Sequence, residues 1–397
     1  MIKLGCNTSL PSGWQWAEAG KVIDIRDGTH DSPKPVEDGI PLVTSKNLKN
    51  GKIDFSTCTN ISAEDHEQIS KRSAVDDGDI LYAMIGTIGN PVIVQGDRDF
   101  SIKNVALFKF SKSQVFNRYF YHLLGSSLVT QQFEKNARGG TQKFVSLGNI
   151  RALQIPLPPL EEQKRIAAIL DKADAIRQKR KQAIDLADEF LRSVFLDMFG
   201  DPVTNPKGWE VRPLGEVLRI RRGASPRPIK DYLGGNVPWI KIGDGSKGDQ
   251  IYLHETKEFV TEAGAQKSVY LDEGALIFAN CGVSLGFARI LKKPGCIHDG
   301  WLAFDNIDND FNKIFLLKWL NQLTKHFRRI APDGTQPNLN TAIMKEQELI
   351  CPPIELQLNF ESVVHRTDTL LGKLKQSYEY DNEFFNSLSQ KAFSGQL

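Results

Sequence analysis

Few residue groups in this 397-residue sequence have types and spacings that could do chemistry. Asp76, Asp77 and Asp79 bring three carboxylates together, but they stand in a turn before a β-like run, which favours solvated turn residues. The string Asn-Pro-Lys-Gly at 205–208 comes nearest to the Asn/Asp-Pro-Pro-aromatic motif of an adenine methyltransferase. Because it lacks the second proline and the aromatic residue, we interpret it as a linker turn.

Metal and nucleotide chemistry find no support in the sequence. The seven histidines and five cysteines show no spacing typical of a metal site. A G-x-x-x-x-G-K-[ST] phosphate loop is missing, and the glycine-rich turns at 86–89 and 282–286 lack a strand–turn–helix context. We therefore expect no catalytic residues, no metal and no cofactor bound by this chain.

Composition sets broad limits on the protein. Hydrophobic residues make up 40% and charged residues 25%, which is typical of a soluble globular protein of two or three domains. The 50 basic and 48 acidic residues give a net charge of +2, which permits nucleic-acid binding without predicting it. Scattered cysteines and the lack of a long apolar run favour a cytoplasmic protein without a membrane segment.

The sequence is a tandem repeat with an offset of about 195 residues. Six short matches recur in the same order: Gly13-Trp14 with Gly208-Trp209, Gly28 with Gly223, 78–81 with 274–277, 116–120 with 311–315, 140–142 with 334–336, and 158–163 with 352–357. Between these matches the halves differ widely. The sequence therefore predicts one fold used twice, with different surface chemistry each time.

Each half divides into a globular part and a long helix. We expect mixed α+β globules over 1–157 and 201–351, and helical spacers over 158–200 and 352–397, each starting at a Pro-Pro pair. A 3-4 spacing predicts that the helices pair as an antiparallel coiled coil with pseudo-two-fold symmetry. The predicted seam consists of Ile166, Ile169, Ile176, Phe190, Val363, Leu370, Leu374 and Phe384.

Three segments resemble a known family. Gly140-Thr141-Gln142, the segment 155–166 (Ile-Pro-Leu-Pro-Pro-Leu-Glu-Glu-Gln-Lys-Arg-Ile) and the end 390–395 (Gln-Lys-Ala-Phe-Ser-Gly) resemble the Type I restriction–modification specificity subunit. The resemblance implies two target-recognition domains that each read half of a bipartite, asymmetric DNA sequence. It also implies helices that set the spacing and dock two methyltransferase subunits.

The resemblance assigns the chemistry to partner subunits. Methyltransferase subunits would bind S-adenosylmethionine and methylate adenine at N6, and restriction (motor-nuclease) subunits would use ATP and Mg. Two alternatives stay open: a non-catalytic coiled-coil scaffold, and a specificity-like subunit of another defence system.

Side chains that reach the major-groove edges of double-stranded DNA are Arg, Lys, Asn, Gln, Ser and Thr on loops. The candidates in the first half are Arg26, Thr29, His30, Lys46, Asn47, Thr87, Lys103, Asn104, Thr141, Gln142 and Lys143. Those in the second half are Arg221, Arg222, Ser225, Lys241, Asn280, Thr335, Gln336 and Asn338. The two Gly-Thr-Gln loops are the preferred candidates because glycine allows close approach to a phosphate.

Overall fold

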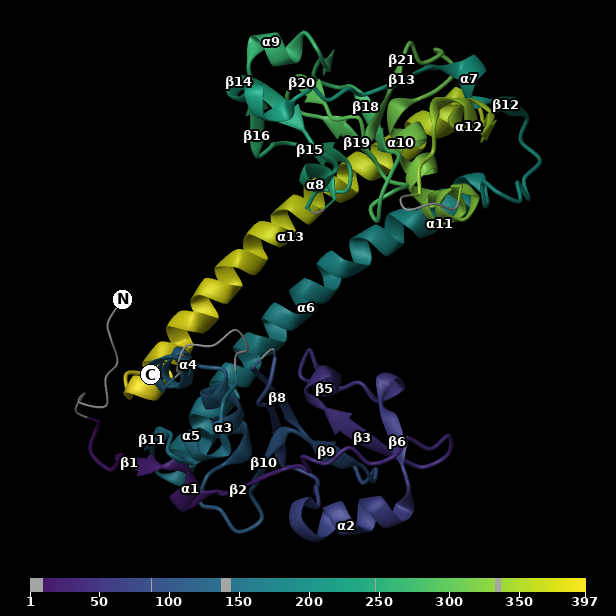
Figure 1. The fold of residues 1–397 in the computed structure, drawn as a ribbon. Helices are drawn as coiled ribbons and strands as arrows, with labels where there is room; N and C mark the ends of the chain where they lie inside the picture. Colours follow the sequence, from purple (N-terminus) through teal and green to yellow (C-terminus); the bar gives the residue numbers. More distant parts are fainter. Residues whose placement is uncertain (1–9, 87, 137–143, 247, 333–336) are drawn as a thin grey trace. The chain divides into compact units, whose positions relative to one another are not determined.

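The computed structural model describes residues 10–86, 88–136, 144–246, 248–332 and 337–397. The chain divides into unit 1, formed by Met1–Lys181 with Gln376–Leu397, and unit 2, formed by Gln182–Lys375 (Figure 1). No helix among the described residues is long and apolar enough to cross a membrane.

The main sheet of unit 1 is antiparallel, in the order β2-β10-β7-β8. Its strands are β2 (Asp24–Asp27), β10 (Val105–Lys109), β7 (Ile80–Ala83) and β8 (Gly89–Ile93). Side chains of β7 alternate between two hydrophobic clusters: Ile80 and Tyr82 belong to one, and Leu81 and Ala83 to the other. Both faces of this strand are therefore buried, which explains its unbroken apolar run.

A second sheet of unit 1 has the order β6-β3-β9, with β3 and β9 parallel. Its strands are β6 (Thr59–Ile61), β3 (Ile40–Thr44) and β9 (Ser101–Lys103). Helix α2 starts where the Ser62 hydroxyl accepts a hydrogen bond from the Asp65 amide at 3.1 Å. The other elements are β1 (Gln15–Glu18), α1 (Ala19–Val22), β4 (Leu48–Lys49), β5 (Lys52–Ile53), α2 (Ala63–Ser73), α3 (Asn117–Leu124), α4 (Ser127–Asn136), α5 (Leu147–Arg151), β11 (Gln154–Leu157) and 3-10 helices η1 (Ser45–Asn47) and η2 (Phe55–Thr57).

Unit 2 contains a five-stranded sheet, β13-β21-β18-β19-β15, and a four-stranded sheet, β16-β14-β20-β17. The strands are β12 (Val211–Pro213), β13 (Arg219–Arg222), β14 (Leu233–Ile240), β15 (Tyr252–Leu253), β16 (Glu258–Val260), β17 (Val269–Leu271), β18 (Leu276–Ala279), β19 (Ala288–Leu291), β20 (Gly295–Ile297), β21 (Trp301–Asp305) and β22 (Glu348–Ile350). The helices are α7 (Leu214–Val217), α8 (Ile242–Gly245), α9 (Glu262–Ala265), α10 (Lys313–Gln322), α11 (Thr324–Ile330), α12 (Thr341–Lys345) and the 3-10 helix η3 (Ile229–Asp231).

The predicted repeat is confirmed in the fold. Strands β2, β10 and β7 of unit 1 correspond in order and pairing to β13, β21 and β18 of unit 2. The parallel pair β3–β9 recurs as β14–β20, and the strand pair β1–β11 recurs as β12–β22. Unit 2 adds β15 and β17 at the edges of its two sheets.

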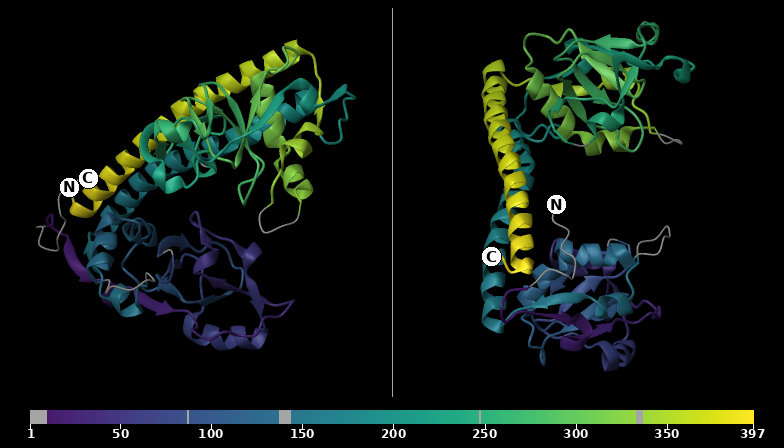
Figure 2. Two further views of the ribbon diagram at one scale, coloured as in Figure 1. Left: turned by 45° about the horizontal axis from the view of Figure 1, so that its top comes forward. Right: turned by 90° about the vertical axis from the view of Figure 1, so that its left-hand side faces the viewer.

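Two long helices, α6 (Leu160–Phe199) and α13 (Ile354–Ser394), contribute to both units. In unit 1, Arg177 contacts Asn382, and Arg180 pairs with Asp381 at 3.2 Å. In unit 2, Phe195 near the end of α6 packs on Phe360 near the start of α13. Within each unit the two segments are therefore antiparallel, and the α/β part lies on one side of them (Figure 2).

The buried face of the helices is shifted by one residue from the predicted seam. Ile166 is buried, but Ile176, Phe190, Leu370 and Phe384 are 51–61% exposed, so their predicted burial is wrong. The burial pattern along α6 instead follows Gln163, Ala167, Leu170, Asp174, Arg177, Ile184, Leu191, Phe195 and Met198. Of the remaining seam candidates, Ile169, Val363 and Leu374 are partly buried.

A buried glutamine joins each long helix to its α/β part. The Gln163 carbonyl accepts from the Phe116 amide at 2.8 Å, and its amide donates to the Pro158 carbonyl at 2.9 Å. Gln357 makes the same pair of bonds with Asn312 and Pro352, both at 2.8 Å. The glutamine of the repeated Pro-Pro-x-Glu-x-Gln string therefore fixes the helix start.

Candidate nucleic-acid interface

In each unit, a loop follows the first strand of the main sheet, which is β2 in unit 1 and β13 in unit 2. This loop crosses the strand of the second sheet that pairs in parallel with its neighbour, β9 in unit 1 and β20 in unit 2. We call this place the crossing. In unit 1 the Thr29 amide donates to the Ile102 carbonyl at 3.0 Å, and in unit 2 the Ala224 amide donates to Ile297 at 3.1 Å. A Cβ atom on Gly28 would lie 2.2 Å from the Ile102 oxygen of β9, and one on Gly223 would lie 2.2 Å from the His298 oxygen just after β20. The glycine that recurs in both halves is therefore required by close backbone approach.

Unit 1 places a histidine and an asparagine together at this crossing. His30 Nδ1 lies 2.8 Å from Asn104 Oδ1, and His30 Nε2 lies 3.0 Å from Asp27 Oδ2. The His30 side chain is 63% exposed, whereas Asp27 is buried and also pairs with Arg72. The crossing thus presents an exposed imidazole that is held from two sides.

Unit 2 builds the equivalent crossing around a carboxylate. Ser225 Oγ donates to Asp299 Oδ1 at 2.8 Å, and Arg222 Nε donates to the Asp299 carbonyl at 3.0 Å. Burial raises the pKa of Asp299, but Ser225 and the nearby cations outweigh burial and keep it below its usual value. Burial lowers the pKa of His298, which lies 2.9 Å from this carboxylate. Unit 2 therefore offers arginine, hydroxyl and carboxylate groups where unit 1 offers imidazole and amide.

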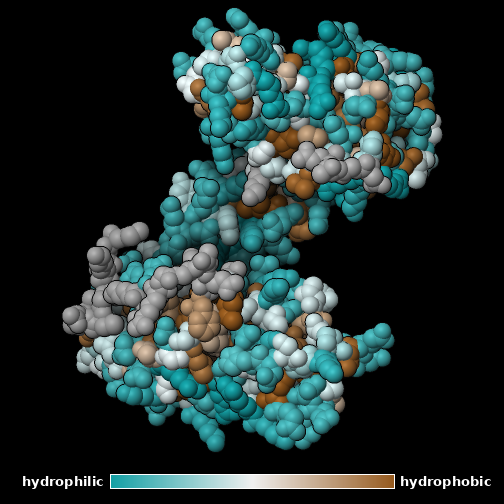
Figure 3. All heavy atoms as spheres, viewed as in Figure 1, coloured by the Kyte–Doolittle hydropathy of each residue, from teal (hydrophilic) through white to brown (hydrophobic). Residues whose placement is uncertain are grey.

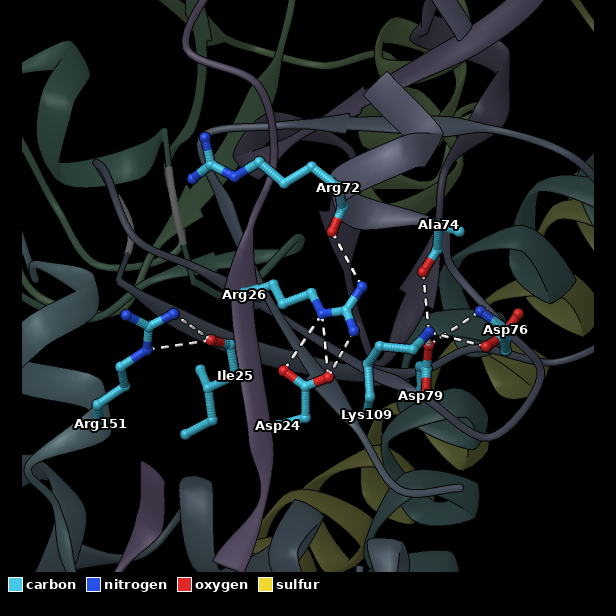
Figure 4. A network of polar contacts seen from close by, with 9 residues as sticks. All are labelled: Asp24, Ile25, Arg26, Arg72, Ala74, Asp76, Asp79, Lys109 and Arg151. Atoms are coloured by element: carbon cyan, nitrogen blue, oxygen red, sulfur yellow. Dashed lines mark hydrogen bonds and ion pairs between the residues drawn. The ribbon is translucent and has the colours of Figure 1, made fainter. Parts of the chain in front are cut away.

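Arg26 belongs to a structural network at the edge of the main sheet (Figure 4). Its guanidinium binds the Asp24 carboxylate at 2.6 Å and the Arg72 carbonyl at 3.0 Å. Beside it, Lys109 donates to Asp76 and Asp79, both at 2.8 Å. Because the Asp79 side chain is only 3% exposed, its interpretation as a solvated turn residue is wrong. Burial raises the pKa of Asp79.

Two candidate asparagines are buried. Asn47 is 3% exposed, and its carbonyl accepts from the amide and the hydroxyl of Thr44, both at 2.8 Å. Asn280 is 0% exposed and donates to Asn338 at 3.0 Å and to the Leu339 carbonyl at 3.1 Å. Both side chains lie inside the fold and stabilise loops, and the assignment of Asn47 and Asn280 to the DNA-binding set stays a prediction.

The other candidates divide into paired and open side chains. Arg221 pairs with Asp305, Lys241 pairs with Glu258, and Lys103 donates to Ser32. Lys46 is exposed in η1. Thr87, Thr141, Gln142, Lys143, Thr335 and Gln336 lie outside the described residues. Both Gly-Thr-Gln loops therefore stay predictions.

The amino-acid sequence of both halves matches the profile of a known family. The profile of the Type I restriction modification DNA specificity domain matches residues 11–186 and 206–375. The chain belongs to this family. Its matched segments cover both halves of the repeat, in agreement with the tandem folds described above.

Relatives within the DNA specificity family span nearly the whole chain. The Type I restriction enzyme MjaIX specificity subunit of Methanocaldococcus jannaschii is 23% identical, with 89% of this chain and 87% of that protein covered. The EcoKI specificity subunit of Escherichia coli K12 is 20% identical, with coverage of 98% and 90%.

Solved structures support the fold. A chain from a structure concerned with complex assembly and conformational transition of the type I R-M system has a TM-score of 0.63 at 19% identity, covering 98% of this chain and 100% of that one. The Type-I restriction-modification S subunit from M. genitalium has a TM-score of 0.56 at 16% identity, covering 99% and 98%.

Proposed function

We propose that this chain is the DNA-reading subunit of a Type I restriction–modification complex, and that each unit reads one half of a bipartite target. The observation that carries the proposal is the loop crossing, where one backbone arrangement holds His30 and Asn104 in unit 1 but Arg222, Ser225 and Asp299 in unit 2. Donors and acceptors of different kinds select different base edges in the major groove. Two different half-sites follow from two different crossings.

Exposed apolar side chains on the long helices support a docking surface for methyltransferase subunits. In unit 1, Ile176, Tyr380 and Phe384 are 54–63% exposed, and in unit 2, Phe190 and Leu370 are 51% and 57% exposed. Most of the surface is hydrophilic, with separate apolar patches (Figure 3). Large apolar residues that face solvent on helices are typical of subunit interfaces.

In this proposal the chain is non-catalytic. The methyltransferase partners supply S-adenosylmethionine chemistry, and motor-nuclease partners supply ATP- and Mg-dependent chemistry. Incubation of the pure chain with labelled S-adenosylmethionine and target DNA should give no methyl transfer. Addition of the methyltransferase subunits should restore it, and transfer by the chain alone would contradict this division of labour.

A domain exchange tests modular reading. Residues 15–150 are replaced by the equivalent segment of a relative, and the hybrid is expressed with its methyltransferase subunits. Methylome sequencing should show one half-site changed and the other kept. A change in both halves, or in neither, would exclude independent reading by the two units, and a methylome without a motif would favour the scaffold alternative.

We further propose that α6 and α13 set the length of the spacer between half-sites. Four residues inserted after Lys179 in α6 and four at the matching point of α13 keep the helical phase roughly unchanged and add about 6 Å to each helix. That length corresponds to about two base pairs. The methylated motif should gain spacer length with unchanged half-sites. An unchanged spacer in an active complex would refute the proposal that α6 and α13 set the spacer length.

A further inference from the structure

An apolar side chain stands at the tip of a short loop in unit 2. Val283, between β18 and β19, is 99% exposed, while Leu285 two residues later is 1% exposed and anchors the loop in the core. Gly282 and Gly286 flank these residues with φ of +73° and +100°, so both turns require glycine. The loop places its anchor inward and its valine outward.

Hydrogen bonds hold this loop in place. The Gly282 amide donates to the Pro337 carbonyl at 3.1 Å, and Arg328 Nε donates to the Leu285 carbonyl at 3.0 Å. The Thr324 hydroxyl donates to the Gly286 carbonyl. Since the backbone is fixed and valine has few rotamers, contact at Val283 would cost little conformational entropy.

The helix that supports the loop is basic. Helix α11 (Figure 1) carries Lys325, Arg328 and Arg329, all exposed, and has no acidic residue. Within the part of the chain that the structure describes, none of the three forms an ion pair with a carboxylate. The exposed valine therefore lies beside a concentration of positive charge.

We propose that Val283 packs against the 5-methyl group of a thymine in the major groove of the half-site read by unit 2, and that Lys325, Arg328 and Arg329 contact the flanking phosphates. The thymine methyl is the apolar group that a base pair presents on its major-groove edge. The three cations match the backbone charge that would surround it. This inference rests on the proposed function. It assigns DNA contacts to the loop between β18 and β19 and to helix α11, which a search for polar residues on loops does not indicate.

The decisive experiment removes the methyl group of thymine from the DNA, or the methyl groups of Val283 from the protein. After methylome sequencing has given the motif, each thymine of the second half-site is replaced by uracil in a synthetic duplex. Methylation by the assembled wild-type complex should fall about fourfold at one position, the ~0.8 kcal/mol of one buried methyl group. With Val283→Ala, the ratio of methylation on the thymine duplex to methylation on the uracil duplex should approach one at that position. Where uracil replaces a thymine of the first half-site, wild type and Val283→Ala should show the same ratio.

The salt dependence of DNA binding by the assembled complex tests the proposed phosphate contacts of α11. Lys325→Gln and Arg329→Gln should each reduce the slope of log affinity against log salt by about one. Lys293→Gln, an exposed lysine beyond the opposite end of β19, is the matched control and should leave the slope unchanged. Equal slopes for all three variants would overturn the assignment of α11.

The outcomes separate this inference from the proposed function. If the wild-type complex methylates a defined motif but Val283→Ala keeps the thymine-to-uracil ratio at every position, only the valine contact is wrong. A second half-site without an A·T pair would also overturn it. If the complex neither binds nor methylates a defined sequence, the proposed function itself fails. Because Val283 makes no core contact, the thermal midpoint of Val283→Ala should match wild type, which excludes misfolding as the cause.

Discussion

The two units attach their α/β parts to the long helices through contacts that are only partly the same. In unit 2 the junction is aromatic: Phe195 and Phe199 of α6 pack on Phe315 of α10 and Phe360 of α13, with ring centroids 4.9–5.8 Å apart. All four side chains are fully buried. The energy of this junction comes from apolar burial and packing.

Unit 1 keeps part of this joint, since Phe393 of α13 packs on Tyr119 of α3 with ring centroids 5.5 Å apart, and it adds a polar cluster farther along α6. Arg118 and His122 of α3 both bind the Asp171 carboxylate of α6, at 2.6 Å and 2.7 Å. Near them, Arg177 covers the Phe385 ring of α13 at 4.4 Å and donates to Asp174. The repeat offset of 194 places Ser389 where unit 2 has Phe195, but Phe393 where unit 2 has Phe199. The comparison teaches that a duplicated scaffold keeps its topology and an apolar joint, while the side chains around that joint change in kind.

The largest expected effect is the loss of the aromatic joint. Phe195→Ala should destabilise unit 2 by about 3–5 kcal/mol, because it removes a fully buried ring and leaves a cavity. Hydrogen exchange followed by mass spectrometry should show faster exchange in α10 peptides and unchanged exchange in α3. Leu196→Ala, at an exposed neighbour on the same helix, is the control. Equal protection in both variants would contradict the aromatic account.

The next effect should be the same in both units. Gln163→Ala and Gln357→Ala each leave buried backbone groups without partners and should cost about 1–3 kcal/mol. Urea unfolding should show a lower midpoint for each, while Lys164→Ala, on the exposed face, should unfold like wild type. A cost in one unit only would mean that the glutamine is structural in one copy of the repeat and not in the other.

A smaller, pH-dependent effect should be confined to unit 1. Burial raises the pKa of Asp171, but His122 and Arg118 outweigh it and hold this pKa at about 2. Since the folded pKa lies below the unfolded value of about 3.9, the stabilisation is complete above about pH 4 and is lost as pH falls towards 2. Asp171→Asn should cost about 1–2 kcal/mol at pH 7. The gap in unfolding free energy from wild type should close between pH 4 and pH 2, and a pH-independent gap would refute the ion pair as its source.

The smallest effect is expected at an exposed helix position. Ile176→Ser should change the unfolding free energy by about 0.5 kcal/mol or less, because Ile176 is 54% exposed. Ile166→Ala, at a buried position of the same helix, should cost several times more. A large cost at Ile176 in the isolated chain would restore the seam predicted from the sequence.

The sequence predicts the repeat and the helices well but places the buried face of α6 one residue away. Apolar residues stand side by side, as Ile169 and Leu170 do, so spacing alone supports two phases. The phase is decided by Gln163, Asp174 and Arg177, whose hydrogen bonds make polar residues acceptable in a buried seam.

The sequence is also a weak guide to which loop residues are exposed. Asn47 and Asn280 look like exposed readers of bases because asparagine is common in turns, yet both satisfy backbone or side-chain groups inside the fold. Loop position predicts His30 and Ser225 as candidates, and both lie at the crossing. Asp299, the partner of Ser225, could not be inferred because it lies 74 residues farther along the chain, whereas Asp27, the partner of His30, is only three residues away.

Unit 1 is built from segments separated by the whole of unit 2, and this has a consequence for biosynthesis. Ala392 and Phe393 belong to the hydrophobic core of unit 1, and Gly395 lies against Pro11. Residues 10–181 therefore leave the ribosome without the helix that completes their core, whereas Gln182–Lys375 is contiguous. We expect the second unit to finish folding before the first, and a released chain truncated after Lys375 to contain a protease-sensitive unit 1 and a protected unit 2.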